Sequence, residues 1–218
     1  MPNKAAIAGA SGLIGSYLLD ILLKEPQYDE VLTLVRKELP IQHKKLVQLV
    51  IDFEKLDEHA AAITGHAVFC CLGSTRKKTP DLSEYRKIDH DYPLKLARLA
   101  KQNGMKQYHL VSAIGANPMS SNFYTKMKGE IEEAIKHTGI ECIHIYEPSV
   151  LTGHRKESRP MERFIIGLMK VINPLLIGGL KKYQSISARI VAQAMFNQSL
   201  KTEEGIFVHP FDKIKLLA

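Results

Sequence analysis

A short apolar segment, a turn with three glycines and an apolar helical pattern follow one another at the start of the chain. The turn reads Gly9-Ala10-Ser11-Gly12-Leu13-Ile14-Gly15, between the apolar segment 5–8 and a helical pattern over 13–24. A strand that enters a helix through glycines brings free backbone N–H groups and the positive end of the helix dipole to one point. The turn therefore predicts a pyrophosphate site that comprises Gly9, Ser11, Gly12, Leu13, Ile14 and Gly15. The alternative is an ordinary glycine turn, since the spacing is one residue longer than Gly-x-Gly-x-x-Gly.

The same alternation of strand and helix continues along most of the chain. Further apolar segments lie at 31–35, 46–51, 67–72, 108–111, 142–146 and 205–208, and helical patterns lie at 82–102, 123–137, 159–171 and 188–200. The apolar segments are short and barely alternate, as is typical of parallel strands buried on both faces. We therefore expect an α/β fold with one doubly wound, mostly parallel sheet and helices on both faces.

Composition narrows the class of protein. The chain has 218 residues, of which 45% are hydrophobic, and this predicts one domain over 1–218 with a short substrate-side region from about 149 to 218. No apolar run approaches the roughly 18 residues of a membrane helix, and three cysteines form no disulfide framework, so we expect a reducing cytoplasm. The net charge of +7 is scattered in short basic runs, which favours an anionic cofactor over nucleic acid. The histidines lack metal-ligand spacing, and no metal is expected.

Side chains at the carboxyl ends of the next predicted strands would contact a bound dinucleotide. Arg36 and Lys37 follow the second strand, where an arginine suits the 2′-phosphate of NADP and an acidic residue suits NAD. After the third strand, Asp52 is placed to accept a hydrogen bond from adenine, and Phe53 is placed to flank its ring. After the fourth strand, Leu72-Gly73-Ser74 would let the backbone pass close to the cofactor.

Three further residues are candidates for catalysis. Tyr124 and Lys128 are four residues apart in a helical pattern and therefore share one helix face. A nearby ammonium favours phenolate, which makes a tyrosine more useful for acid–base chemistry. Ser112 ends the fifth predicted strand, where its hydroxyl would orient a substrate carbonyl or alcohol. Tyr-x-x-x-Lys is a weak motif, and its position after the fifth strand gives it weight.

Taken in order, the glycine turn, Asp52, Ser112, Tyr124-x-x-x-Lys128 and Pro148-Ser149-Val150 resemble the short-chain dehydrogenase/reductase superfamily. Several stretches resemble one atypical branch, that of the oxidoreductase-like Tat-interacting proteins and their small microbial relatives. These stretches include 71–76, Asp89-x-Asp91-Tyr92, 120–123, 128–130 and 155–160. The resemblance implies a Rossmann fold that prefers NADP(H) to NAD(H). It also implies that Tyr124 is the acid–base, that Lys128 holds the nicotinamide ribose, that Ser112 steadies a small carbonyl or alcohol substrate, and that Pro148 and Val150 meet the nicotinamide.

The chain also departs from that branch. Ser112-Ala113 stands where relatives often have Ser-Ser, and Glu147-Pro148-Ser149 stands where they often have Arg-Pro-Gly. We do not expect nucleotide-sugar chemistry, because only 70 residues follow Pro148. Two functions therefore remain open. One is an NADPH-dependent oxidoreductase; the other is a non-catalytic NADPH-binding module that senses redox state and acts through a protein partner. The sequence also leaves a homo-oligomer open.

Overall fold

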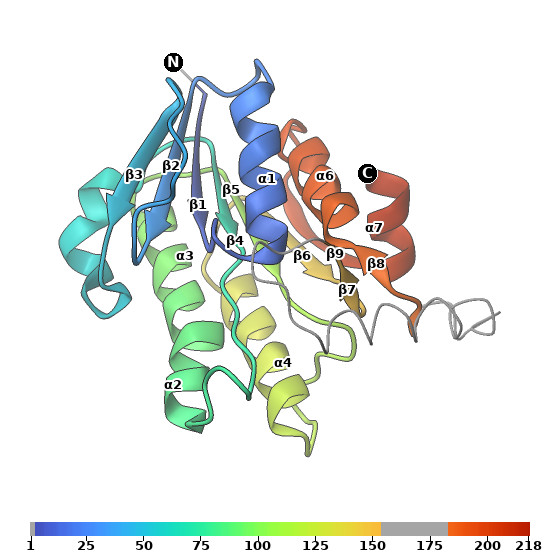
Figure 1. Cartoon of the computed structure of the whole chain (residues 1–218). Helices are drawn as coiled ribbons and strands as arrows, with labels where there is room; N and C mark the ends of the chain where they lie inside the picture. The colour runs from blue at the N-terminus through green and yellow to red at the C-terminus, as the bar shows by residue number, and fades with distance from the viewer. Residues whose placement is uncertain (1–2, 154–182) are drawn as a thin grey trace.

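A seven-stranded parallel sheet forms the centre of the molecule (Figure 1). The structure is a computed structural model and describes residues 3–153 and 183–218. Within these residues the strand order is β3-β2-β1-β4-β5-β6-β9. The strands are β1 Lys4–Ala8, β2 Glu30–Val35, β3 Leu46–Val50, β4 Ala67–Cys70, β5 Gln107–Val111, β6 Cys142–Glu147 and β9 Gly205–Pro210. A separate pair, β7 Leu151–Thr152 and β8 Ile186–Ser187, is also parallel.

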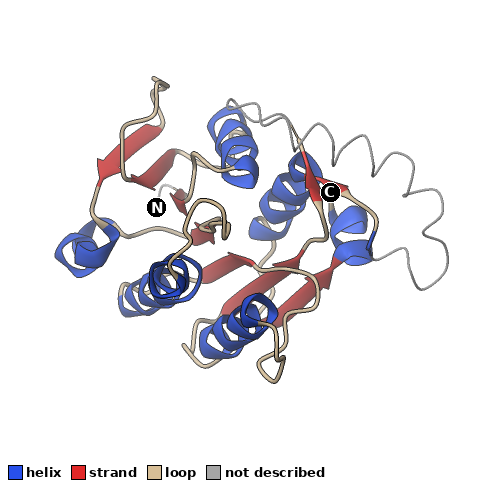
Figure 2. Ribbon diagram, turned by 60° about the horizontal axis from the view of Figure 1, so that its bottom comes forward, coloured by secondary structure: helices blue, strands red, loops and turns tan. Residues whose placement is uncertain are grey.

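Helices cover both faces of the sheet (Figure 2), and a separate hydrophobic core lies on each side. One core contains residues of α1 Leu13–Lys24, α6 Ala188–Ser199 and α7 Phe211–Leu217. The other contains residues of the 3₁₀ segment η1 Phe53–Ala62, α3 Tyr92–Gln102 and α4 Phe123–Lys136. The short helix α2 Leu82–Arg86 continues into α3 through a π-helical turn, η2 Lys87–Asp91. This arrangement confirms the expected doubly wound fold.

Three details differ from the sequence prediction. Residues 82–102 are helical, as predicted, but residues 87–91 among them form a π-helical turn in place of an α-helical one. The segments η1 and α7 were not predicted: α7 has only seven residues, and η1 is a kinked 3₁₀ segment with few apolar residues. Strand β3 was predicted to be buried on both faces, and this is wrong: Val47 and Val50 are 44% and 53% exposed because β3 is an edge strand. The predicted helix 159–171 and the branch-like stretch 155–160 lie outside the described residues.

The strand order reverses direction between β1 and β4. Connections from β1 lead toward β2 and β3, whereas later connections lead toward β5, β6 and β9. The two strands separate at their carboxyl ends, just beyond the hydrogen bond from Cys71 N–H to the Ala8 carbonyl, 2.8 Å long. In open parallel sheets, ligands bind in the crevice at this reversal. The glycine turn begins there, directly after β1.

A row of buried histidines crosses the other half of the sheet. His109 on β5 and His144 on β6 are register partners whose rings stack 4.7 Å apart. His144 Nδ1 lies 2.9 Å from Nε2 of His209 on β9. Burial lowers the pKa of His109 well below its usual value, that of His144 to about 3 and that of His209 to about 4. The rings are therefore neutral at pH 7.

Candidate functional site

The glycine turn after β1 is held by contacts that only glycine permits. Gly9 has φ +85°, and its carbonyl accepts a 2.9 Å hydrogen bond from Gly12 N–H. A Cβ on Gly15 would lie 2.2 Å from that same carbonyl oxygen. Gly12 caps α1 without a side-chain hydrogen bond, and no acidic residue lies in the first helical turn. The N-terminus of α1 therefore has neither a side-chain cap nor an acidic side chain, which leaves it open to the pyrophosphate that the sequence predicts there.

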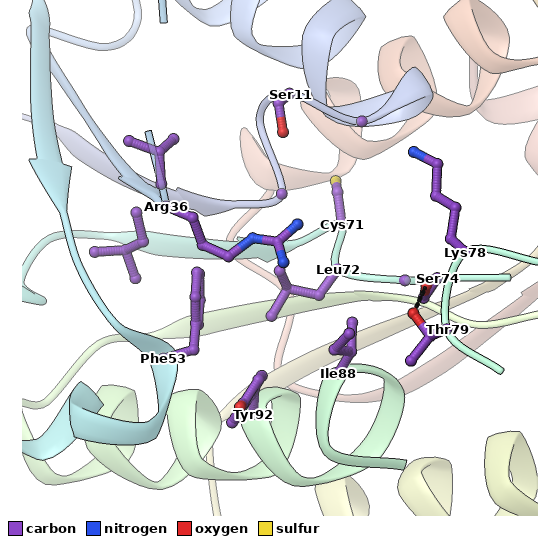
Figure 3. Close-up of a pocket in the computed structure, with 15 residues that line it drawn as sticks. Ser11, Arg36, Phe53, Cys71, Leu72, Ser74, Lys78, Thr79, Ile88 and Tyr92 are labelled. Atoms are coloured by element: carbon purple, nitrogen blue, oxygen red, sulfur yellow. Dashed lines mark hydrogen bonds between the residues drawn. The ribbon is translucent and has the colours of Figure 1, made fainter. Parts of the chain in front are cut away.

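A pocket of about 360 Å³ opens beside this turn at the carboxyl ends of β1, β2 and β4 (Figure 3). Eight predicted cofactor residues line it: Gly9, Ser11, Gly12, Arg36, Phe53, Leu72, Gly73 and Ser74. The pocket is therefore at the strand reversal. Its size lies within the ordinary range for small-molecule sites.

Arg36 and Phe53 occupy the end of the pocket where an adenosine is expected. Arg36 is exposed at the tip of β2, and its guanidinium extends into the pocket above Phe53 (Figure 3). Phe53 is 5% exposed and packs against Tyr92, with ring centroids 5.6 Å apart. The pocket therefore combines a cation with an apolar aromatic wall, as a phosphorylated nucleoside requires.

Other predicted cofactor residues do not line the pocket. Leu13, Ile14 and Gly15 are buried in α1, where they pack the helix against the sheet. Lys37 is exposed and lies outside the pocket lining. Asp52 is exposed and caps η1, since its carboxylate accepts a 3.0 Å hydrogen bond from Glu54 N–H. Their contact with a cofactor stays a prediction.

Pro148 and Val150, predicted to meet the nicotinamide, follow β6. The Pro148 carbonyl accepts a hydrogen bond from Ile114 N–H at 3.0 Å, and the Val150 carbonyl accepts one from Ile186 N–H at 2.9 Å. Pro148 is buried and Val150 is 43% exposed. Both lie outside the lining of the pocket, and their role stays a prediction.

The sequence reasoning missed part of the pocket wall. Lys78 and Thr79 come from the loop after β4, and Ile88 and Tyr92 come from the helices that follow it. In Figure 3 Lys78 and Arg36 extend from opposite sides of the pocket. The signals available were the basic run Arg76-Lys77-Lys78 and the string Asp89-x-Asp91-Tyr92. Neither has a spacing that identifies a cofactor contact by itself.

Tyr124 and Lys128 lie on one face of α4, as their spacing predicts. Tyr124 is 36% exposed and stacks on Tyr85, with centroids 6.4 Å apart and planes 14° from parallel. Lys128 is 4% exposed. Burial raises the pKa of Tyr124 above its usual value, while the Lys128 charge lowers it and Asp89 raises it. The expected lowering by Lys128 is present, but burial outweighs it.

The Lys128 ammonium has a buried carboxylate as its partner. Its Nζ lies 3.0 Å from Oδ1 of Asp89, whose side chain is 2% exposed. Burial lowers the pKa of Lys128, but Asp89 and Tyr124 raise it by more, so the net pKa lies above the usual value. Lys128 is therefore a protonated, fixed charge beneath Tyr124 at neutral pH.

Ser112 makes a contact that the sequence did not predict. It is 5% exposed at the end of β5, and its hydroxyl donates a short hydrogen bond to Oε1 of Glu132 on α4. Burial raises the pKa of Glu132 to about 7, and the Ser112 hydrogen bond opposes that rise. The hydroxyl proton of Ser112 is thus directed to Glu132 and not toward a substrate. Its substrate role stays a prediction.

Two kinds of site are absent from the residues that the structure describes. These residues contain no group of three or more His, Cys, Asp or Glu side chains arranged to hold a metal ion. Nor do they contain a helix long and apolar enough to cross a membrane. The thiols of Cys70, Cys71 and Cys142 are free.

Several solved structures have the same fold as this chain. The chain resembles MoeE5 in complex with UDP-glucuronic acid and NAD, with a TM-score of 0.74, 18% identity and coverage of 95% of this chain and 75% of that one. It also resembles a UDP-N-acetylglucosamine 4-epimerase from Methanobrevibacter ruminantium, with a TM-score of 0.70, 19% identity and coverage of 96% and 77%. At these identities the likeness shows the fold alone.

Relatives found by sequence have a higher identity to this chain than these structures have. Protein HTATIP2 of Rattus norvegicus is 41% identical over 167 residues, which cover 74% of this chain and 69% of that protein. The mitochondrial protein fmp52 of Aspergillus clavatus is 34% identical over 210 residues, which cover 92% and 88%. A family model described as NAD(P)H-binding matches residues 9–160, which include the glycine turn, the pocket and the Tyr124–Lys128 pair. The chain therefore belongs to the NAD(P)H-binding family, as an atypical member of the short-chain dehydrogenase/reductase type.

Proposed function

We propose that this chain is an NADPH-dependent oxidoreductase that interconverts a small carbonyl compound and its alcohol. One observation carries the proposal: a partly exposed phenol, Tyr124, shares a helix face with the buried, charged Lys128. The cofactor pocket, which begins at the glycine turn, supplies the second component. An acid–base group near a nicotinamide site is the arrangement that carbonyl reduction requires.

Tyr124 is suited to donate a proton at neutral pH. Its pKa is raised by burial, so the phenol keeps its proton until a substrate oxygen gains negative charge. NADPH, when bound, supplies the hydride that goes to the carbonyl carbon. The Lys128 charge then stabilises the phenolate that Tyr124 becomes, and the reverse direction requires that phenolate first. The protonated phenol at neutral pH is the form that carbonyl reduction requires.

The preference for NADP(H) rests on Arg36. Its guanidinium enters the pocket at the tip of β2, where the sequence predicts the 2′-phosphate of the adenosine ribose. Among the described residues that line the pocket none is acidic, so none of them offers a carboxylate that would select the 2′-hydroxyl of NAD. We expect both features together to favour the phosphorylated cofactor. A cytoplasmic location, suggested by the free cysteines, is part of the same proposal.

A non-catalytic NADPH-binding module that acts through a protein partner is the second candidate. The contact between Ser112 and Glu132 favours it, because that serine's proton is engaged inside the protein. A substrate oxygen would receive a hydrogen bond from Ser112 only after this contact is exchanged. The two candidates share the cofactor pocket. They differ in whether the chain converts a substrate with Tyr124 as proton donor or acts through a protein partner.

The substitution Tyr124→Phe tests the catalytic proposal. It keeps the ring stacked on Tyr85 and removes the proton, so NADPH affinity stays unchanged while turnover falls by about 10²–10⁴-fold. Aldehydes, ketones and quinones are screened by NADPH absorbance to find the substrate. Tyr85→Phe is the matched control and keeps turnover, because Tyr85 is 3% exposed. Turnover of Tyr124→Phe at the native rate would refute the proposed role of Tyr124. Tight NADPH binding with no substrate in the screen would favour the second candidate.

A further inference from the structure

A second cation faces the cofactor pocket, opposite Arg36. Lys78 lines the pocket from the loop after β4, whereas Arg36 lines it from the tip of β2. In Figure 3 the Arg36 guanidinium lies above Phe53, and the Lys78 ammonium points toward the side of the pocket that carries the glycine turn with Ser11. Among the described residues no Asp or Glu side chain forms an ion pair with either cation, and none lines the pocket. Both charges therefore face a ligand without a competing carboxylate from these residues.

The loop that carries Lys78 is held by its own hydrogen bonds. The Thr75 carbonyl accepts hydrogen bonds from the N–H groups of Lys78 and Thr79, each 2.9 Å long. The hydroxyls of Ser74 and Thr79 lie 2.6 Å apart, and this contact closes the loop where it leaves β4. Ser74 and Thr79 also line the pocket. The backbone of Lys78 is thus fixed beside the pocket, and only its flexible side chain has to become ordered when an anion binds.

A bound NADP(H) presents negative charge at two separate places. A phosphate monoester such as the 2′-phosphate carries about −1.5 to −2 charges at pH 7, and both phosphates of the pyrophosphate are ionised as well. Arg36 is expected at the 2′-phosphate. At the pyrophosphate, the N-terminus of α1 supplies N–H donors and the equivalent of about half a positive charge. The glycine turn 9–15 contains no Lys or Arg, so a full positive charge for the pyrophosphate has to come from another part of the chain.

We propose that Lys78 binds the pyrophosphate of NAD(P)H, which is thereby held between the glycine turn and the loop after β4. The lysine ammonium is a compact charge with three donors, which suits a charge shared by two neighbouring phosphates. The planar guanidinium of Arg36 suits bidentate contact with a single phosphate. The inference rests on the proposed function only in the assignment of Arg36 to the 2′-phosphate, and it does not depend on proton transfer by Tyr124.

The two cations therefore have different effects on cofactor choice. NADPH and NADH share the pyrophosphate, so Lys78 contributes equally to the binding of both. Only NADPH has the 2′-phosphate, so Arg36 contributes to NADPH alone. Lys78 sets how tightly either cofactor is held, and Arg36 sets which of them is preferred.

The substitution Lys78→Met removes the charge and keeps a straight side chain of similar length. Lys78 is exposed, so the variant folds as the native chain does, which circular dichroism checks. NADPH affinity is measured by calorimetry, and NADH affinity is measured by displacement of NADPH. Both affinities fall by the same factor of about 10-fold or more, the scale of a hydrogen bond to a charged group. Lys78→Arg keeps the charge and binds both cofactors more tightly than Lys78→Met does.

Two further variants show which phosphate Lys78 contacts. Lys77→Met makes the same change in net charge at the exposed neighbour that does not line the pocket, and its losses are smaller than those of Lys78→Met. Arg36→Met lowers the affinity for NADPH and leaves that for NADH unchanged. In the double variant Arg36→Met/Lys78→Met the two fold-losses for NADPH multiply, because the two contacts are made with different phosphates.

The outcomes separate this inference from the proposed function. If Lys78→Met weakens NADPH binding but not NADH binding, Lys78 contacts the 2′-phosphate and the inference is wrong. Equal losses in Lys78→Met and Lys77→Met would also overturn it, because overall charge alone would then explain them. If Arg36→Met weakens both cofactors equally, the proposed preference for NADP(H) fails, while equal losses of both cofactors in Lys78→Met still support the inference. Tight binding without turnover of any substrate counts against the oxidoreductase and leaves the inference intact, and a native chain that binds neither cofactor would overturn both.

Discussion

The row of buried histidines makes the stability of the sheet sensitive to acid. His109, His144 and His209 are neutral when folded, because burial lowers the pKa of each ring. In the unfolded chain a histidine has a pKa of about 6.5. The folded state therefore binds fewer protons than the unfolded state below pH 6.5, and the free energy of unfolding falls as the pH falls.

The size of the effect follows from the two pKa values near 3 and 4. Between pH 7 and pH 5, His144 and His209 each lower the free energy of unfolding by about 2 kcal/mol. Glu132 acts in the opposite direction, because a carboxyl whose pKa is raised to about 7 gains its proton in the folded state first. That gain is about 2 kcal/mol over the same interval. The net loss for these three groups is about 2 kcal/mol, and His109 adds to it.

The substitution His209→Phe isolates one member of the row. His209 packs against Tyr146, with centroids 4.9 Å apart and ring planes tilted by 35°, and its buried Nδ1 has no hydrogen-bond partner among the described residues. Phenylalanine keeps the ring and removes the titration, so between pH 7 and pH 5 the variant loses about 2 kcal/mol less than the native chain. The absolute stability also changes, because His144 loses its contact. Only the pH dependence is compared.

Urea unfolding followed by circular dichroism at pH 7, 6 and 5 measures this difference. His43→Phe makes the same substitution in an exposed loop and keeps the pH dependence of the native chain. If the free energies of native chain and His209→Phe fall in parallel, the buried ring does not titrate as described, and the reasoning fails.

Three further substitutions test the site and its support. Arg36→Asp weakens NADPH binding by about 1.5–3 kcal/mol and narrows the preference for NADPH over NADH, as titrations with both cofactors would show. Lys37→Asp, at a residue outside the pocket, has a smaller effect, and equal losses in the two variants would contradict the role of Arg36. Gly12→Val places a Cβ 3.1 Å from the Gly9 carbonyl oxygen and lowers NADPH affinity by more than about 100-fold, while circular dichroism shows a folded chain. Retained NADPH affinity would mean that the turn has only a structural role. Gly129→Ala places a Cβ 2.2 Å from Pro118 N, and this clash lowers the free energy of unfolding by about 3 kcal/mol, more than the gain of about 1 kcal/mol from the better helix propensity of alanine. An unchanged free energy of unfolding in urea would refute that packing.

The sequence predicts best what is encoded locally. Strand β1, the glycine turn and α1 follow from adjacent residues, and the predicted bounds of α1 are the observed ones. The exposure of β3 could not be predicted in the same way, because an edge strand is defined by the absence of a neighbour and not by its own composition. Segment η1 has few apolar residues, and its position depends on Phe53 and Leu56 packing against the sheet.

The site shows the same limit. The pocket contacts of Arg36 and Gly73 follow from their places after strands, but Ser112 and Lys128 have partners far away in the sequence. Glu132 is 20 residues from Ser112, and Asp89 is 39 residues from Lys128. Only the packing of the helices against the sheet brings these side chains together, so the roles assigned from Tyr-x-x-x-Lys alone remain predictions.

The π-helical turn also restricts how the length of this segment can change. No loop separates α2 from α3, and a π turn holds one residue more than an α turn. Tyr85, before the turn, stacks on Tyr124, while Tyr92, after it, packs against Phe53. Deleting one residue within 87–91 would turn the π turn into an α turn and keep both contacts, whereas deleting one within the α-helical residues 92–102 would rotate the residues beyond it by about 100°. We therefore expect a single-residue deletion among relatives to be tolerated at 87–91, and other insertions and deletions to fall in the loop 74–81.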